Sequence, residues 1–284
     1  QLGYHPDGTH TFSSAATSAG YNLKYLFDTG LSVERESGGS IDRFRGRVMF
    51  PIHQISGKVS GFGGRILSKD KKVAKYLNSP ESEVYHKSQV LYGIHLARKA
   101  IVSQDECYLV EGYTDVISLH QAGVENVVSS SGTSLTQDQI RIIQRYTRNL
   151  TFLFDGDAAG LKAAFRGIDM VLAQGMNIRI VPFPDGEDRD SFARKNTPLF
   201  VQDYLRDQAV DFIHFKASIL LKEAGGDPIR MAEVIRDIIQ SLSLVPDPIM
   251  RSVYVRECAR VLDMPEATLI AELNRLIRSS QRKA

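Results

Sequence analysis

The central part of the chain alternates short apolar runs with amphipathic stretches. Four apolar runs have the length of buried strands, at residues 107–110, 126–129, 150–154 and 177–182. Stretches with helical periodicity follow them, at residues 115–122, 136–146, 158–174 and just after 190. This alternation predicts a mostly parallel sheet covered by helices, because parallel strands are joined by helical crossovers.

After residue 196 the pattern becomes helical throughout. Thr197 and Pro198 are typical of a helix start, and the helix is predicted to run to about Ala224. Three further helices are predicted at residues 228–242, 249–262 and 265–278. Within the first of these three, apolar positions with helical spacing form a core stripe: Val234, Ile235, Ile238 and Ile239.

The first hundred residues mix both patterns. An amphipathic helix is expected over residues 17–29, ended by Gly30, and another over 88–102 with core positions Leu91, Ile94 and Leu96. Residues 43–52 read as a strand, and residues 75–80 as a loop with a basic entry. The glycines of GFGGR at 61–65 indicate close backbone approach, either to a ligand or at a bulge.

Three domains are therefore expected in a chain of 284 residues. The fold class is α/β, with a mostly parallel sheet flanked by helices. We assign a basic α+β subdomain to residues 1–103, the sheet domain to 104–196 and a helical subdomain to 197–284.

Charge is unevenly distributed along the chain. The formal net charge is only +2, yet the segment from Arg43 to Lys99 contains 12 Lys or Arg residues and three acids. A basic block beside an acidic cluster suits a polyanion held in a groove. The alternative is a solvated surface without a ligand.

Arg43, Arg45 and Arg47 alternate with other residues. On a strand, this spacing would place all three on one face. Neighbouring guanidinium groups repel one another unless an anion lies between them, and phosphate matches their geometry. The alternative is three solvent-exposed arginines that protect a sheet edge.

Acidic residues follow three of the four predicted strands. Glu111, Asp155 and Asp157 come directly at strand ends, with Asp115 a little further on, and Asp188 and Asp190 follow the last strand. The carboxyl ends of parallel strands meet at one edge, where ligands bind. An all-oxygen set without His or Cys favours Mg²⁺ or Mn²⁺ over zinc, and two such ions suit displacement at phosphorus. Taken singly, each acidic pair is also typical of a helix cap or a solvated turn.

Several classes of protein are disfavoured. No apolar run approaches the roughly 20 residues that span a membrane. Cys107 and Cys258 are far apart and form no CxxC pair, so neither a zinc ribbon nor a disulfide framework is expected, and a cytoplasmic setting is the default. The chain does not begin with Met, so we expect it to be cut from something longer.

Four motifs in the predicted sheet domain resemble those of a TOPRIM domain, a metal-binding fold shared by primases, topoisomerases and some nucleases. They are EGYTD at 111–115, GTSLT at 132–136, FDGDAAG at 154–160 and DRD at 188–190. The preceding basic segments resemble motifs of bacterial replicative DNA primases, and they are RFRGRVMFPI at 43–52, GFGGR at 61–65 and KYLNSP at 75–80.

This resemblance implies a DNA-dependent RNA polymerase that makes short RNA primers from NTPs on single-stranded DNA, by attack of a 3′-hydroxyl on an α-phosphate. It implies that Glu111 lies closest to the chemistry and that Asp155 and Asp157 are the main Mg²⁺ or Mn²⁺ ligands. Asp115, Asp188 and Asp190 would complete the metal sites. Nucleotide and template contacts are implied for Arg43, Arg45, Arg47, Arg65, Lys75, Asn78 and Lys87.

The resemblance also implies a monomer without a membrane partner. A zinc-binding module and a helicase-binding module are both expected outside this chain. The chain departs from the family at Arg189, where a Pro usually separates the two aspartates. A TOPRIM-type nuclease and a non-catalytic nucleic-acid-binding fragment remain as alternatives.

Overall fold

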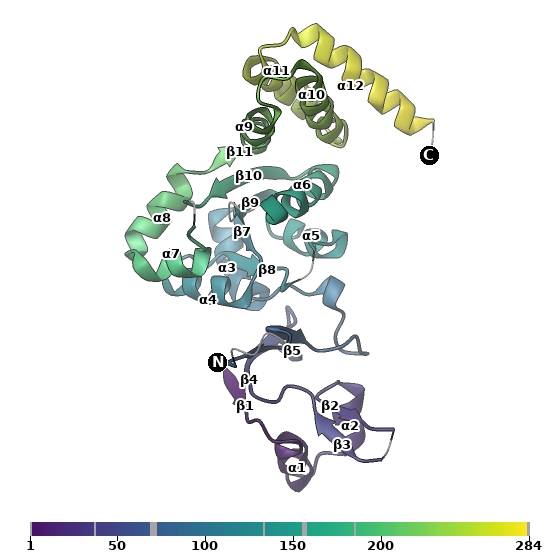
Figure 1. The fold of residues 1–284 in the computed structure, drawn as a ribbon, viewed down its shortest axis with the longest axis vertical. Helices are drawn as coiled ribbons and strands as arrows, with labels where there is room; N and C mark the ends of the chain where they lie inside the picture. The colour runs from purple at the N-terminus through teal and green to yellow at the C-terminus, as the bar shows by residue number, and fades with distance from the viewer. Residues whose placement is uncertain are drawn as a thin grey trace.

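The chain folds into three regions that follow one another along the long axis of the molecule (Figure 1). A computed structural model describes residues 2–36, 38–68, 73–132, 134–154, 158–184 and 186–282, with the side chains of 158–163 left out. The N-terminal region lies at one end, a sheet with flanking helices in the middle, and a group of helices at the other end.

The middle region contains a five-stranded sheet with strand order β11–β10–β9–β7–β8. Strands β7 to β10 are parallel, and β11 pairs antiparallel with β10 at one edge. The strands are β7 Cys107–Val110, β8 Val127–Ser129, β9 Asn149–Phe154, β10 Asn177–Pro182 and β11 Val210–Asp211. The helices around them are α3 Ile94–Gln104, α4 Tyr113–Gln121, α5 Gln137–Gln144, α6 Ala158–Ala173, α7 Arg189–Lys195 and α8 Pro198–Asp207. The predicted α/β class is therefore confirmed.

The sheet is buried on both faces. On β7, Cys107 and Leu109 belong to one apolar cluster and Tyr108 and Val110 to another, because successive strand residues point to opposite faces. The first cluster includes side chains of α3, α5 and α6, and the second includes side chains of α4, α7 and α8. Strands that are apolar on both faces explain the continuous apolar runs of the sequence.

The parallel strands present their carboxyl ends at one edge. Strand β7 ends at Val110, immediately before Glu111, and β9 ends at Phe154, immediately before Asp155. Asp155 and Asp157 lie outside the described residues, so their side chains stay a prediction.

The N-terminal region is built on an antiparallel sheet of order β1–β4–β5–β6. Its strands are β1 Gly3–His5, β4 Arg47–His53, β5 Val59–Ile66 and β6 Tyr76–Asn78, and a separate hairpin pairs β2 Ser32–Glu34 with β3 Ser40–Asp42. Two short helices, α1 Thr11–Ser18 and α2 Leu23–Asp28, replace the single helix expected over 17–29. Gly30 follows α2 with a φ of 66°, as predicted for its end.

The prediction that three arginines share one strand face is wrong. Strand β4 begins only at Arg47, while the preceding residues form a turn around the fully buried Phe44. The Arg47 side chain is buried and donates hydrogen bonds to the carbonyls of Gly64, Ala74 and Lys75. It therefore holds β5 and the segment leading into β6 together.

Two other local predictions need correction. A 3₁₀ turn, η1 Lys87–Gln89, and an extended segment come before α3, which starts at Ile94 rather than at 88. Gly93 has a φ of 88°, which breaks any helix at that point. Leu91 and Ile94 are buried as predicted, but Leu96 is 69% exposed. The expected loop at 75–80 contains strand β6.

The C-terminal region consists of α9 Phe212–Ala224, α10 Pro228–Ser243, α11 Pro248–Leu262 and α12 Glu266–Gln281. The single helix expected from 198 to 224 is wrong, because β11 divides it into α8 and α9. Asp211 pairs with Arg179 of β10 and then caps α9 by accepting the N–H of Ile213 at 2.8 Å.

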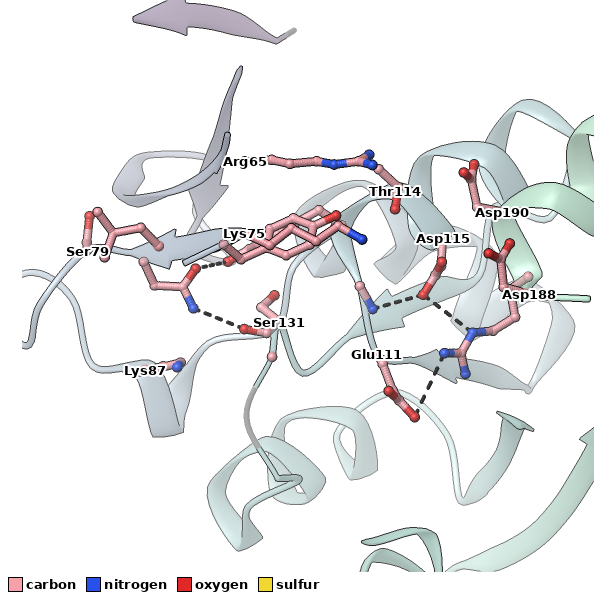
Figure 2. Close-up of a pocket in the computed structure, with 17 residues that line it drawn as sticks. Arg65, Lys75, Ser79, Lys87, Glu111, Thr114, Asp115, Ser131, Asp188 and Asp190 are labelled. Carbon is pink, nitrogen blue, oxygen red and sulfur yellow. Dashed lines mark hydrogen bonds and ion pairs between the residues drawn. The ribbon is translucent and has the colours of Figure 1, made fainter. Parts of the chain in front are cut away.

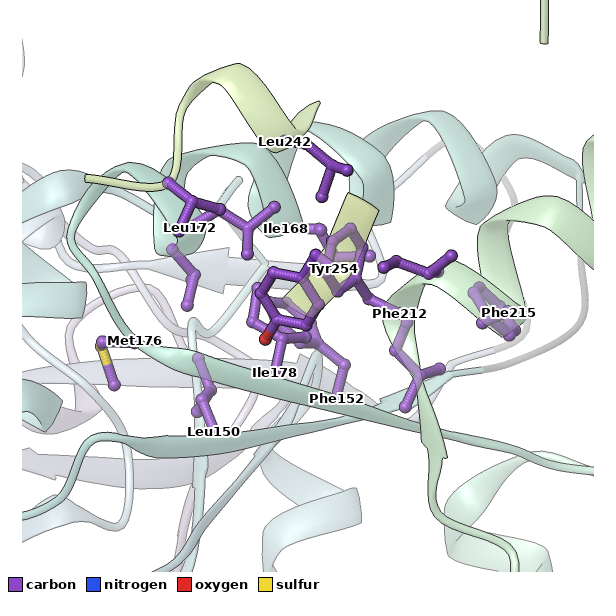
Figure 3. Packing of buried hydrophobic residues seen from close by; sticks show 14 of the residues in the cluster. Leu150, Phe152, Ile168, Leu172, Met176, Ile178, Phe212, Phe215, Leu242 and Tyr254 are labelled. Atoms are coloured by element: carbon purple, nitrogen blue, oxygen red, sulfur yellow. The ribbon is translucent and has the colours of Figure 1, made fainter. Parts of the chain in front are cut away.

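The C-terminal helices share a core with one face of the sheet (Figure 3). Phe152 and Ile178 of the sheet belong to the same apolar cluster as Phe212, Leu242 and Tyr254 of α9 to α11. The predicted core positions Val234, Ile238 and Ile239 are buried in this cluster, and Ile235 packs against it. The domain boundaries at 103/104 and 196/197 remain predictions. In the described ranges, no helix combines the length and apolar character required to cross a membrane.

Candidate functional site

A cavity of about 600 Å³ lies between β5 and β6 of the N-terminal region and the carboxyl edge of the parallel sheet. Its described lining includes three cations contributed by the N-terminal region, namely Arg65, Lys75 and Lys87. It also includes four carboxylates from the sheet region, Glu111, Asp115, Asp188 and Asp190. Figure 2 shows the two groups on opposite sides of the cavity. The site thus combines an anion-binding side with a cation-binding side.

The first two acids stand where β7 turns into α4. Glu111 is the residue directly after the strand, and its side chain is 68% exposed. Asp115 lies in the first turn of α4 and is largely buried, where it accepts the N–H of Gly112 at 3.0 Å. Burial raises the pKa of Asp115, while Arg189 and the Gly112 hydrogen bond oppose that rise. Local backbone geometry therefore holds Asp115 firmly and leaves Glu111 more accessible.

The other two acids begin α7. Asp188 caps the helix by accepting the N–H of Ser191 at 2.7 Å, and hydrogen bonds from Ser191 lower the pKa of this carboxyl. Asp190 accepts a hydrogen bond from the hydroxyl of Ser118 on α4 and pairs with Arg194 at 3.0 Å. The cap role weighed as an alternative for such acids is thus real for Asp188, and it coexists with a place in the cavity wall.

Arg189 stands between these two aspartates and is 3% exposed. Its Nη2 lies 3.8 Å from Oε1 of Glu111, and its Nε lies 3.4 Å from Oδ2 of Asp115. Its Nη1 donates a hydrogen bond to the carbonyl of Leu153 on β9. The guanidinium therefore lies among the acids of the edge, on the cavity wall.

The atom types that line the acidic side of the cavity suit a hard divalent cation. The four described carboxylates supply only oxygen, and neither His nor Cys lines the described part of the cavity. No three His, Cys, Asp or Glu residues among those described lie close enough together to form a metal site by themselves. The described residues therefore supply four of the six predicted carboxylate ligands, and the other two, Asp155 and Asp157, lie outside the described residues.

Asn78 joins the two sides of the cavity. Its Oδ1 accepts a hydrogen bond from the hydroxyl of Tyr113 at 2.7 Å, and its Nδ2 donates to the carbonyl of Ser131 at 3.1 Å (Figure 2). Both ends of the amide are thus engaged within the protein. Asn78 fixes β6 to α4 and to the loop after β8, which sets the width of the cavity.

Tyr113 is buried in an aromatic group beneath β5. Its ring stacks on Phe50 at 5.0 Å and meets Tyr92 edge-on at 4.8 Å. A Cβ at Gly63 would lie 2.5 Å from this ring. The close approach predicted for these glycines is explained at Gly63 by the Tyr113 ring, and the predicted bulge corresponds to the register shift between β4 and β5 beside Gly61.

Tyr113→Phe is expected to lower the free energy of unfolding by about 1–2 kcal/mol, because the side-chain Oδ1 of Asn78 loses its hydrogen-bond donor in a partly buried place. Urea unfolding followed by circular dichroism measures this change. Tyr25→Phe is the matched control, since Tyr25 is exposed. Equal losses in the two variants would contradict a role for the Tyr113 hydroxyl in fixing Asn78.

The residues predicted to contact nucleotide and template divide into two groups. Arg65, Lys75, Lys87 and Asn78 line the cavity, whereas Arg43, Arg45 and Arg47 are not among its described lining residues. Arg43 donates a hydrogen bond to the backbone carbonyl of Asn78 at 3.5 Å.

Aromatic residues of the site were missed by the sequence analysis. Tyr113 was quoted only within a motif, and Tyr76 lies beneath Arg65 and Lys75, whose charged groups are 5.8 and 6.0 Å from its ring centroid. Their signal was a tyrosine within two residues of a predicted acid or base.

Models of three protein families match successive parts of the chain. Residues 1–98 match the N-terminal domain of the DNA primase catalytic core, and residues 108–193 match a Toprim-like domain. Residues 223–267 match the DnaB-helicase binding domain of primase. This last match lies inside the chain, which differs from the expectation that helicase-binding residues lie outside it.

Individual relatives agree with these matches. The DNA primase of Clostridium acetobutylicum is 39% identical over 262 residues, which cover 90% of this chain and 42% of that protein. A crystal structure of a DNA primase domain from Pseudomonas aeruginosa superimposes with a TM-score of 0.85 at 34% identity and covers 98% of this chain and 86% of that one. A DnaG primase catalytic domain bound to single-stranded DNA superimposes with a TM-score of 0.78 at 34% identity, over 91% and 84% of the two chains.

The chain spans about half the length of the curated primases that it matches. Its similarity to the Pseudomonas domain nevertheless extends over most of both chains, and the fold matches that domain from the N-terminal sheet to the C-terminal helices. The acidic edge and the basic wall described above occupy the two parts of the chain that match the Toprim-like and N-terminal core models. The chain therefore belongs to the bacterial DNA primase family.

Proposed function

We propose that this chain is the RNA-polymerase core of a primase, which joins ribonucleotides into short primers on a single-stranded DNA template. The observation that carries the proposal is the cavity in which three cations face four carboxylates of the TOPRIM edge. The similar DnaG domain solved with single-stranded DNA supports a nucleic-acid template for this chain as well.

In this proposal the cations act on phosphates. Arg65, Lys75 and Lys87 hold the triphosphate of the incoming nucleotide or the template backbone by charge-assisted hydrogen bonds. Asn78 keeps the wall that carries Lys75 at a fixed distance from the acids. A 3′-hydroxyl loses its proton to water as its oxygen attacks the α-phosphate, the bond to the bridging β-phosphate oxygen breaks, and pyrophosphate leaves with the electron pair.

The acids hold divalent cations. We assign the ligand role to Glu111, Asp115, Asp155, Asp157, Asp188 and Asp190, with Asp155 and Asp157 as the main ligands and Glu111 nearest the chemistry. Bound Mg²⁺ or Mn²⁺ would neutralise the charge that develops on the phosphate oxygens. The support is the all-oxygen donor set of the described cavity and the divalent-metal character of the Toprim fold.

Primer synthesis on single-stranded DNA with labelled NTPs and Mg²⁺ or Mn²⁺ tests the proposal. RNA products that require all of these components would support it. Divalent-dependent loss of DNA without NTPs would instead favour a TOPRIM-type nuclease. Binding of DNA without either reaction would favour a non-catalytic fragment.

Template binding is expected to depend strongly on salt, because contacts to the phosphate backbone release counterions. Lys75→Gln is expected to weaken binding of single-stranded DNA and to reduce the slope of log K against log salt by about 0.7. Lys24→Gln is the control, because Lys24 lies on α2, away from the described cavity lining. Fluorescence anisotropy of a labelled oligonucleotide at several salt concentrations measures both slopes. Parallel slopes for wild type and Lys75→Gln would contradict a contact between Lys75 and a template phosphate.

The C-terminal helices offer a place for a partner. We propose that the segment 223–267, which contains α10 and α11, contributes to binding of a replicative helicase in the cytoplasm, and the match to the helicase-binding domain supports this. A monomer is the expected state of the chain itself, and zinc is expected only in an N-terminal module of the whole protein. Analytical ultracentrifugation with and without helicase tests these assignments.

A further inference from the structure

One cation of the cavity lies on its acidic side. The Arg189 side chain reaches from the start of α7 toward the ends of β7 and β9. Ion pairs with Glu111 and Asp115, dashed in Figure 2, and a hydrogen bond to the carbonyl of Leu153 hold it there. Arg194 of the same helix also pairs with Asp190, but its side chain is mostly exposed and is not among the described lining residues of the cavity. The charge of Arg189 is therefore built into the edge, whereas that of Arg194 is at its rim.

The position of Arg189 in α7 makes this arrangement specific to its side chain. Arg189 is the first residue of the helix, directly after the cap Asp188. A first helical residue needs no backbone N–H donor, so Pro is well suited there, and Pro is the residue that usually separates the two aspartates in the family that this chain resembles. The guanidinium is thus an addition to a backbone that does not require it.

We propose that Arg189 is a resident counter-cation of the acidic edge, which positions Glu111 and Asp115 in the absence of metal and must move before these two carboxylates bind a divalent ion. This inference rests on the proposed function of the same edge. A guanidinium within 4 Å of both carboxylates neutralises part of the charge that would otherwise attract a metal ion. Removal of that cation leaves the acids free to bind the ion or to repel one another.

Two consequences follow for the chain. Without metal, Arg189 holds Glu111 and Asp115 in place because its guanidinium pairs with both carboxylates and offsets their mutual repulsion. With metal, part of the binding free energy is spent on displacing the guanidinium, so divalent ions bind more weakly than they would to a chain with a neutral residue at 189. Both consequences concern binding and stability rather than turnover.

Direct titration of Mn²⁺, followed by the electron paramagnetic resonance of the free ion, tests the inference on wild type, Arg189→Pro and Arg189→Gln. Both variants are expected to bind Mn²⁺ at least about tenfold more tightly than wild type, or to bind an additional ion. Their melting temperatures are expected to fall below that of wild type without metal and to rise more on addition of Mn²⁺. Arg141→Gln is the matched control and is expected to change Mn²⁺ affinity by less than about twofold, because Arg141 pairs with Asp138 at the exposed surface and neither residue lines the described cavity.

The outcomes separate this inference from the proposed function. If wild type binds Mn²⁺ and both Arg189 variants give the same isotherm, the counter-cation role is wrong and the metal site stands. If neither wild type nor variants bind Mn²⁺, the metal assignment itself fails. Arg189→Gln keeps the test valid if Arg189→Pro does not fold, because Gln retains a donor for the carbonyl of Leu153.

Discussion

Glu111→Gln is expected to lower primer synthesis by at least about 100-fold while the chain keeps its fold. The substitution keeps the shape of the side chain and removes only its negative charge. Glu111 follows β7 directly at the wall of the cavity, so the charge is lost at the place where phosphate chemistry is proposed. Product RNA from labelled NTPs on single-stranded DNA, measured at saturating Mg²⁺ or Mn²⁺, gives the ratio of rates.

Stability is not expected to change much in this variant. The Glu111 side chain is 68% exposed, and its one described ion pair, with Arg189, spans 3.8 Å. With one exposed partner at this distance the pair contributes about 0–1 kcal/mol, and the buried Arg189 keeps its ion pair with Asp115. Urea unfolding of Glu111→Gln should therefore nearly coincide with that of wild type, which separates loss of chemistry from loss of fold.

Glu125→Gln is the matched control for the activity measurement. Glu125 is also exposed and belongs to the same region, but it does not line the described cavity. Its activity should equal that of wild type within about twofold. Equal activity of Glu111→Gln and Glu125→Gln would remove Glu111 from the proposed chemistry.

The sheet and its acidic edge were predictable because their pattern is local. Each buried strand is a run such as Leu150 to Phe154 that is apolar on both faces, and three of the four parallel runs are followed by a segment that carries acids. Strands that are parallel then bring these turns to one edge without further information. Glu111, Asp115, Asp188 and Asp190 line one cavity for this reason.

Predictions failed where contacts between distant residues decide the structure. The spacing of Arg43, Arg45 and Arg47 suits a strand face, but burial of Phe44 and the carbonyls that surround Arg47 impose a turn before β4. The helix expected from 198 to 224 breaks because two of its residues, Val210 and Asp211, complete the edge of the sheet beside β10. The hydrophobic periodicity of the sequence indicates which residues are buried, but it does not indicate which residues they pack against.

The inward position of Arg189 could not be predicted from the sequence either. In the sequence Arg189 stands out only as a departure from the usual Pro. A basic residue next to two aspartates is ordinarily exposed. Nothing in the neighbouring sequence indicates that the guanidinium of this helical residue reaches the carbonyl of Leu153 on β9. Only the packing of α7 against α4 and the sheet places this charge among the acids.

Lys216→Ala is expected to lower the free energy of unfolding by about 2–3 kcal/mol, because it breaks a buried polar network. Lys216 lies on α9 within the shared core and is only 1% exposed. Its Nζ is 2.8 Å from Oδ2 of Asp237 and donates to the hydroxyl of Ser241 at 2.8 Å, and that hydroxyl donates in turn to Asp169 on α6 at 2.6 Å. This loss of stability is smaller than that expected for a fully buried ion pair, because Asp237 is half exposed and water can solvate it.

This network decides how the C-terminal helices attach to the sheet region, since Asp169 belongs to α6 and the other members to α9 and α10. Burial raises the pKa of Asp169, while the Ser241 hydrogen bond and the charge of Lys216 oppose that rise. Lys216→Met should cost less than Lys216→Ala, about 1–2 kcal/mol, because the methionine refills the space while the charge is still lost. Lys222→Ala on the same helix is exposed and should change stability by less than about 0.5 kcal/mol. Urea unfolding followed by circular dichroism measures all three variants, and a Lys216→Ala value equal to that of Lys222→Ala would show that the network does not hold the two regions together.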